Sequence, residues 1–107
     1  SPFCCYGQFS RLAGADAAIF TSFGGRFPFT EEVCRKICDG TETEMGGLRS
    51  IFPVPSGGMK WQLFKKMVQV YGPDAIFLVG GALLTESDDL TANMHFYFEK
   101  LNEAVNK

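Results

Sequence analysis

The sequence has no long apolar run, no block of like charge and only one histidine, His95. A membrane-spanning helix needs roughly 20 consecutive apolar residues, and no stretch of the chain approaches that length. The opening residues, SPFCCYGQFSR, do not form a basic segment followed by an apolar one, as a secretion signal would. The 10 basic and 12 acidic residues are dispersed and leave a formal net charge of −2. We therefore predict a cytoplasmic protein that binds neither nucleic acid nor a membrane.

The four cysteines do not have the spacing of a zinc site. Cys4 and Cys5 are adjacent, whereas Cys34 and Cys38 stand one helical turn apart. A zinc site usually takes two tight pairs of ligands, and the single histidine lies far along the chain. We therefore expect no metal site in this chain, and we interpret the cysteines as small apolar core residues of a protein in a reducing compartment.

The chain is rich in apolar side chains, which make up 46% of its 107 residues. That content is enough for one hydrophobic core, and the length allows at most one domain. The first residue is Ser1 rather than methionine, and it lies within an apolar amphipathic segment. We therefore expect residues 1–107 to be a single fragment of a longer protein.

Strands and amphipathic helices alternate along the sequence. Runs of β-branched and aromatic residues predict strands over 17–22, 51–55 and 75–79, the last apolar throughout, as in a parallel strand covered on both faces. Apolar residues at helical spacing predict helices over 2–13, 31–39, 59–71 and 90–105. Thr30 and Asp89 are suited to cap the second and the last helix, and Gly40 to end the second. In the last helix, the predicted buried face consists of Leu90, Met94, Tyr97, Phe98, Leu101 and Val105. This order predicts an α/β fold of right-handed, parallel βαβ units.

Each predicted strand is followed by a pair of glycines: Gly24-Gly25, Gly57-Gly58 and Gly80-Gly81. The carboxyl ends of parallel strands meet at one edge of a sheet, where ligands of such folds bind. Backbone N–H groups of glycine are open to an anion because no Cβ blocks them. The pattern predicts a phosphate site, although a single such pair is more often only a tight turn. Ser56, just before the second pair, is alternatively a helix cap.

The parallel sheet is either open and doubly wound or part of a (β/α)8 barrel. The sequence contains neither the G-x-G-x-x-G fingerprint of dinucleotide binding nor a G-x-x-x-x-G-K-[ST] phosphate loop. In barrels, phosphate is often held by the loops after the last two strands. The motifs SGG and VGG, about two dozen residues apart, have that spacing, so we favour a partial TIM (β/α)8 barrel.

Four motifs in this order resemble the carboxyl-terminal barrel of the RuBisCO large subunit, and more closely the RuBisCO-like (type IV) proteins. They are LAGAD at 12–16, GGRFPF at 24–29, PVPSGGM at 53–59 and VGGAL at 79–83. The resemblance covers about nine tenths of the chain and runs from barrel strand 6 through barrel strand 8. Members of this family include a methionine-salvage enolase.

The resemblance implies roles for particular residues. Ser56 would contact a substrate oxygen, and Gly57, Gly58, Gly80 and Gly81 would bind one phosphate. Arg26 takes the position of the lysine on the mobile loop of true carboxylases, so it is a candidate catalytic residue. Arginine is a bulkier and planar donor, which argues against carboxylation. Ile19 stands where the carboxylases have a phosphate-binding histidine, which favours a substrate with one phosphate.

The resemblance also implies that the intact parent is a Mg²⁺-dependent enolase or isomerase acting on a phosphorylated, sugar-like substrate. The K-x-D-[DE] pattern that binds the metal in this family does not occur in the sequence. We therefore expect no cofactor in this chain and no activity of the chain alone. We expect it to form a homo-oligomer or to be completed by the rest of the barrel.

Two alternatives stay open. One is a non-catalytic module that binds a phosphorylated metabolite or a partner chain, and the other, less favoured, is a true ribulose-bisphosphate carboxylase.

Trp61 and His95 have simple structural interpretations. We expect Trp61 to pack rather than to line a ligand site. We expect His95 to be a surface residue rather than a base.

Overall fold

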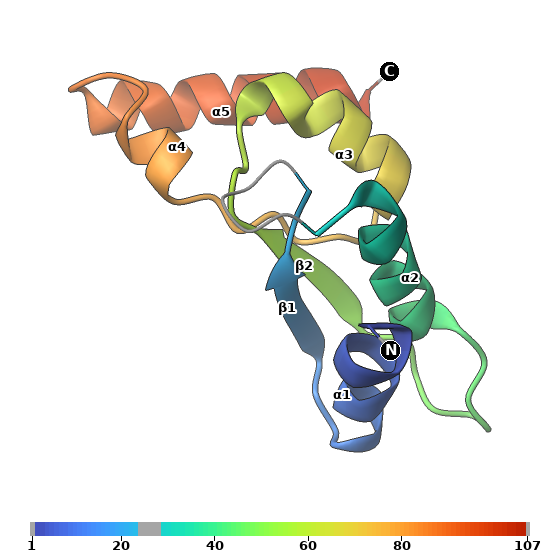
Figure 1. Ribbon diagram of the computed structural model, residues 1–107. Helices are drawn as coiled ribbons and strands as arrows, with labels where there is room; N and C mark the ends of the chain where they lie inside the picture. The colour runs from blue at the N-terminus through green and yellow to red at the C-terminus, as the bar shows by residue number, and fades with distance from the viewer. Residues whose placement is uncertain (1, 24–28, 107) are drawn as a thin grey trace.

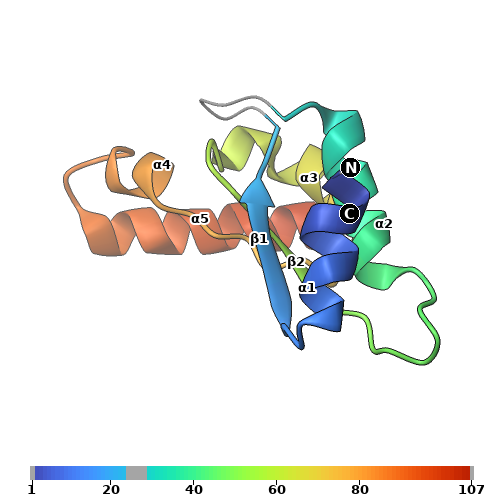
Figure 2. The same ribbon diagram turned by 60° about the horizontal axis from the view of Figure 1, so that its bottom comes forward.

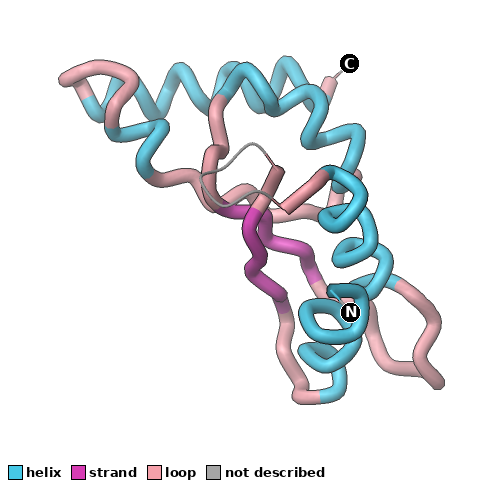
Figure 3. The backbone as a smooth tube through the Cα atoms, viewed as in Figure 1, coloured by secondary structure: helices cyan, strands magenta, loops and turns pink. Residues whose placement is uncertain are grey.

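The computed structural model describes residues 2–23 and 29–106. Its elements are η1 (Phe3–Gln8), α1 (Phe9–Leu12), β1 (Ala17–Thr21), α2 (Glu31–Glu42), β2 (Phe52–Ser56), η2 (Trp61–Leu63), α3 (Phe64–Tyr71), α4 (Gly81–Leu84) and α5 (Leu90–Val105). The two strands lie side by side, with α1 and α2 at one end of the molecule and α4 and α5 at the other (Figures 1 and 3). The molecule is elongated, with extents of 47 × 28 × 22 Å.

β1 and β2 form a parallel pair, as the sequence predicts. Ala18 pairs with Pro53 and Phe20 with Pro55, and α2 makes the connection between the two strands. Parallel strands need such a crossover, since a short turn cannot bring the chain back to start in the same direction. The predicted βαβ unit is therefore present. β2 is displaced by one residue from its predicted bounds.

Segment 75–79 is not the regular third strand that the sequence predicts. The segment lies beside β2. Among the described residues, its only strand pairing is an isolated bridge between Leu78 and Ser56. The amides of Ile76 and Leu78 donate to the carbonyls of Pro53 and Pro55, at 3.0 and 3.1 Å. The return hydrogen bonds of a parallel ladder would have to come from the nitrogens of these same prolines, which carry no hydrogen. The prediction of a regular third strand is wrong because β2 accepts hydrogen bonds from this segment but its prolines cannot donate any in return.

The sheet has one covered face and one face that is open except at Val54, the partner of Ile19, which is 6% exposed. Ala18 and Phe20 of β1, and Pro53 and Pro55 of β2, are buried, and they share a face because paired residues point the same way. On the opposite face Ile19 is 60% exposed, and Ile76 and Leu78 of the neighbouring segment are each 48% exposed. The prediction that segment 75–79 is covered on both faces is therefore also wrong.

The main core forms between the sheet, α2 and α3, with the stripes that the helical spacing predicts. Cys34, Ile37 and Cys38 of α2 and Phe64, Met67 and Tyr71 of α3 are all buried. The hydroxyl oxygen of Thr30 accepts a hydrogen bond from the N–H of Val33 at 3.2 Å, which confirms it as the cap of α2. Two boundaries differ from the prediction: α2 continues past Gly40 to Glu42, and the third helix starts as the 3₁₀ turn η2.

The amino-terminal helix crosses α2 in very close contact. It is a π-helix, η1, that continues into α1, and the sequence predicts only an ordinary helix there. A Cβ placed on Gly7 would lie 2.5 Å from the carbonyl carbon of Gly40, and one placed on Gly40 would collide with the carbonyl oxygen of Phe3. Gly40 is therefore required for the crossing of two helices rather than for the end of one.

The predicted buried face of α5 is only partly buried. Tyr97 is 5% exposed, but Leu90, Met94, Phe98 and Val105 are between 46% and 60% exposed. The helix itself begins as predicted, since the carboxylate of Asp89 accepts from the N–H of Ala92 at 3.0 Å. Its apolar face extends beyond the elements that pack on it.

None of the helices described is long and apolar enough to cross a membrane.

Candidate functional site

The glycine turns after β2 and after segment 75–79 lie at the same edge of the sheet. The bridge between Ser56 and Leu78 sets the ends of these two segments side by side and parallel. Gly57 and Gly58 directly follow Ser56, and Gly80 follows Leu78 after one residue. Figure 2, which turns the molecule by 60°, shows the chain after segment 75–79 leaving the sheet toward α4. The two predicted phosphate turns therefore begin at the same edge of the sheet.

Gly57 and Gly58 make a turn that other residues would strain. Their φ angles are +84° and +65°, in the left-handed region that glycine adopts readily. The carbonyl of Gly58 accepts from the N–H of Lys60 at 2.9 Å, which directs the chain into η2. Because two successive residues need positive φ, this pair is explained in part by the turn alone.

Gly80 and Gly81 do not share this left-handed conformation, although Gly80, with φ −134° and ψ −95°, lies outside the helical and extended regions. Neither has a positive φ, and a Cβ added to either would meet no atom of the described structure within 4 Å. Gly81 is the first residue of α4, where N–H groups have no acceptor within the helix. Both glycines are exposed and the space where a side chain would lie is open, so a small anion has room to approach this turn.

Ser56 does not cap the following helix. Its hydroxyl instead donates to the carbonyl oxygen of Phe20 on β1, at 3.1 Å. The cap position of η2 is Lys60, without a side-chain hydrogen bond. Because the hydroxyl proton of Ser56 is engaged by the neighbouring strand, its oxygen is left as an acceptor for a ligand hydroxyl.

Three predicted features of the loop after β1 lie outside the described residues: Gly24, Gly25 and the candidate catalytic Arg26. Ile19 can be placed. It is on the open face of β1, 60% exposed, opposite the helices. Its apolar side chain offers no hydrogen bond to an anion, and the interpretation that the substrate carries one phosphate stays a prediction.

The remaining candidates occupy ordinary structural positions. Trp61 packs edge-on against Phe96, with ring centroids 5.3 Å apart, and the ammonium of Lys100 lies 4.7 Å from its ring, so the packing interpretation holds. His95 is exposed, as expected. Cys34 and Cys38 are buried core residues, but Cys5 is exposed, so the core interpretation is wrong for it. Across residues 2–23 and 29–106, no cluster of three or more acidic, cysteine or histidine side chains could hold a metal ion.

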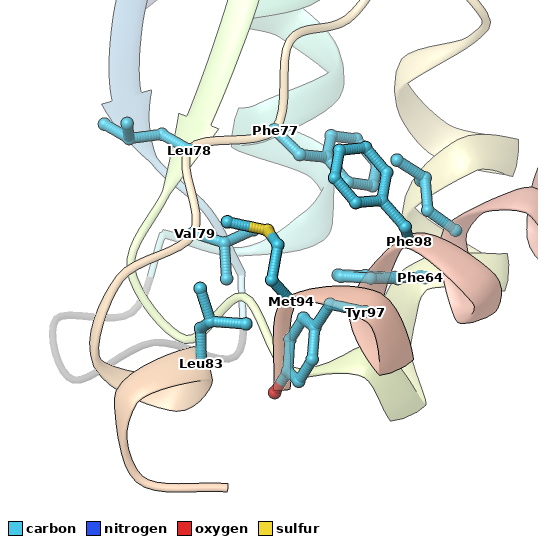
Figure 4. Close-up of a pocket in the computed structure, with 9 residues that line it drawn as sticks. Phe64, Phe77, Leu78, Val79, Leu83, Met94, Tyr97 and Phe98 are labelled. Atoms are coloured by element: carbon cyan, nitrogen blue, oxygen red, sulfur yellow. The ribbon is translucent and has the colours of Figure 1, made fainter. Parts of the chain in front are cut away.

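An apolar cavity of about 270 Å³ adjoins the edge that carries the glycine turns. Figure 4 shows Leu78 and Val79 on one side of it and Met94 and Phe98 of α5 on the other. Its lining includes Met94 and Phe98, two of the exposed residues on the predicted buried face of that helix. The cavity borders α4 through Leu83.

Asn93 fixes the turn between α4 and α5. It is 2% exposed, and its side-chain nitrogen donates to the carbonyls of Leu83 and Ser87, at 2.8 and 3.0 Å. Its side-chain oxygen accepts from the hydroxyl of Ser87 at 2.5 Å. Neither α4 nor this anchor is expected from the sequence, because a four-residue helix has no periodicity and the role of Asn93 depends on folded contacts.

The chain is similar to known proteins over most of its length. It is 43% identical over 86 residues to 5-methylthioribulose-1-phosphate isomerase of Rhodospirillum rubrum, covering 80% of this chain and 23% of that protein. It is 32% identical over 98 residues to a putative 2,3-diketo-5-methylthiopentyl-1-phosphate enolase of Shouchella clausii, covering 92% and 26%. The crystal structure of a RuBisCO-like protein of Rhodopseudomonas palustris matches it with a TM-score of 0.80 at 26% identity, covering 95% and 26%. No family model matches the sequence.

The fold and these similarities define a segment of an α/β-barrel protein of the RuBisCO type. The chain belongs to the RuBisCO-like proteins. It spans about a quarter of the length of the relatives it matches.

Proposed function

We propose that this chain is a fragment of the carboxyl-terminal barrel domain of a RuBisCO-like enzyme and supplies its phosphate-binding turns. The enzyme would isomerise a methylthio-substituted sugar phosphate, with 5-methylthioribulose 1-phosphate as the first candidate substrate. The name of the relative that is 43% identical supports this choice. The name of the enolase supports the related diketone phosphate as the second candidate.

The observation that carries the proposal is the placement of two glycine turns at one edge by the bridge between Ser56 and Leu78. In barrels with this arrangement, the loops after the last two strands bind phosphate. Both glycines of the second turn, Gly80 and Gly81, are exposed, neither has a positive φ, and a Cβ added to either would meet no atom of the described residues within 4 Å. A small anion therefore has room to approach this turn, which supports its role as a phosphate site.

The residues of this chain would bind and orient the substrate. Glycine amides would donate to the phosphate oxygens, and the Ser56 oxygen would accept from a substrate hydroxyl next to the reacting carbon. Ile19 would exclude a second phosphate, and this argues against a bisphosphate as substrate. Arg26 stays a candidate catalytic residue for this reaction.

Mg²⁺ is implied by the family, but the described residues of this chain contain no ligand set for it. Any metal ligands, and the base that removes the substrate proton, would therefore belong to other parts of the enzyme. We further propose that the enzyme is cytoplasmic and a homo-oligomer. The open face of the sheet and the exposed side of α5 would be covered by the rest of the barrel.

The proposal is tested with the complete enzyme, expressed from the reading frame that contains this chain. We expect turnover of 5-methylthioribulose 1-phosphate and none of 5-methylthioribulose without its phosphate, measured by proton and phosphorus NMR. Turnover of only the diketone phosphate would identify the enolase instead. Binding of substrate without turnover would favour the non-catalytic module, and binding of neither phosphate would refute the proposal.

A further inference from the structure

A series of hydrogen bonds connects the end of α3 with the candidate site. Tyr71 is the last residue of α3 and is 3% exposed. Its hydroxyl lies 2.7 Å from the hydroxyl oxygen of Ser22, which directly follows β1 and is fully buried. This bond joins two residues that are far apart in sequence, and neither has a role in the function described so far.

Ser22 in turn holds the end of β2. Its N–H donates to the carbonyl of Ser56 at 2.7 Å, while the hydroxyl of Ser56 donates to the carbonyl of Phe20 at 3.1 Å. The ends of β1 and β2 are therefore joined in both directions at the residue just before the first glycine turn. A shift of Ser22 would move Ser56 with it, because the bond from the Ser22 N–H to the Ser56 carbonyl is short.

The hydroxyl of Tyr71 is not needed for packing. The ring contacts Phe20, Phe23 and Phe77, with centroid distances of 5.7, 5.8 and 6.5 Å, and a phenylalanine would keep these contacts. Burial raises the pKa of Tyr71 above its ordinary value, so the hydroxyl stays neutral and available for the bond to Ser22. The hydroxyl is therefore a specific polar link within an aromatic cluster.

We propose that Tyr71 is a positioning residue for substrate binding, because its hydroxyl fixes Ser22 and, through Ser22, the orientation of Ser56 and its turn. The proposal rests on the proposed function, since it takes Ser56 as a substrate contact. Tyr71 itself does not touch the substrate. Its loss should weaken substrate binding rather than the chemical step, since the Ser56 contact exists both before and during the reaction.

The test compares Tyr71→Phe, Ser22→Ala and the double variant in the complete enzyme. We expect KM for 5-methylthioribulose 1-phosphate to rise about 10-fold in each single variant, with kcat changed less than about twofold. The double variant should be no worse than either single one, because both changes break the same bond. If Tyr71→Phe folds poorly, Ser22→Ala alone still tests the proposal, because Ser22→Ala removes the same hydrogen bond and leaves the ring of Tyr71 unchanged.

Thr41→Val is the matched control. Thr41 is fully buried, and its hydroxyl bonds to the carbonyl of Cys38 within α2 at 2.6 Å, so the variant loses a buried hydroxyl away from the strand ends. Its KM should stay at the wild-type value. Equal KM in Tyr71→Phe and Thr41→Val, or losses that multiply in the double variant, would overturn the proposal.

Hydrogen exchange separates this proposal from the proposed function. Peptides covering residues 17–23 and 52–58 should exchange about 10-fold faster in Tyr71→Phe than in Thr41→Val, whatever the substrate is. If the wild-type enzyme does not turn over the sugar phosphate, the proposed function fails and the exchange rates decide on Tyr71. Unchanged exchange in both peptides would refute the positioning role.

Discussion

At the scale of single residues, burial decides the chemistry of the cysteines. Burial raises the pKa of the Cys34 thiol and, with help from the nearby carboxylate of Glu42, raises that of Cys38 to about 12. A thiol reacts only as its thiolate, so both side chains are inert near neutral pH. Cys5, which the sequence could not distinguish from them, is exposed.

We predict that the free energy of unfolding falls as the pH rises above about 9. Above the ordinary cysteine pKa, 9.0 here, the unfolded chain releases the proton of Cys38 while the folded protein keeps it. The folded state then binds more protons than the unfolded state, so stability decreases by about 1.4 kcal/mol per pH unit for each such thiol. Urea denaturation between pH 8 and pH 10 measures the slope.

In Cys38→Ala, the free energy of unfolding should decline less steeply with pH than in the wild type. In Cys5→Ala, which changes an exposed thiol, it should decline as steeply as in the wild type. A Cys38→Ala slope equal to that of the wild type would show that the thiol titrates normally in the folded protein.

At the scale of the elements, Arg11 joins three segments. It is 4% exposed, and its guanidinium donates to the carbonyls of Gly40 and Thr43 at the end of α2 and of Leu48 and Arg49 in the loop before β2. No carboxylate pairs with it among these contacts. The negative end of the α2 dipole and the carbonyl oxygens together stabilise its charge.

Arg11→Met should therefore lower the free energy of unfolding by about 3 kcal/mol, because it leaves several buried carbonyls without a donor. Arg35→Met is the control. Arg35 is exposed on α2 and paired with Glu31 at 3.1 Å, so its loss should cost less than about 1 kcal/mol. Urea denaturation of both variants gives the comparison, and equal losses would contradict the role assigned to Arg11.

The elements show which parts of the fold the sequence can predict. α2 and α3 are predicted well, since their apolar stripes and the cap at Thr30 are local properties of the chain. The third strand is predicted wrongly, because a regular ladder there needs backbone N–H groups from β2, and Pro53 and Pro55 have none. The role of Arg11 also depends on contacts between segments far apart in sequence, and single-chain patterns do not contain that information.

At the scale of the whole molecule, the candidate site lies where distant segments meet. The sequence identifies Ser56 and the glycine pairs because each follows a strand, and the parallel order predicts a common edge. It does not identify Tyr71, Ser22 or Asn93, whose side chains hold that edge from α3, the end of β1 and α5. Residues that act through other residues have no motif of their own.

The open surfaces fit a segment of a larger barrel. The exposed face around Ile19 and the cavity beside Phe98 are both apolar, and segment 75–79 contributes residues to each of them. The relatives are about four times as long as this chain, which spans about a quarter of each. Completion by further strands and helices would bury these surfaces.

The central claim is that the turn at Gly80 and Gly81 binds the substrate phosphate, and Gly81→Val in the complete enzyme tests it most directly. A Cβ there would meet no atom of the described residues within 4 Å, so we expect the fold to be kept while the valine methyl groups hinder an anion at this turn. Leu84→Val is the control, since it places valine at an exposed position of the same helix. Calorimetric titration with 5-methylthioribulose 1-phosphate should show affinity at least about 100-fold weaker for Gly81→Val and unchanged for Leu84→Val. Wild-type affinity in Gly81→Val would contradict the account.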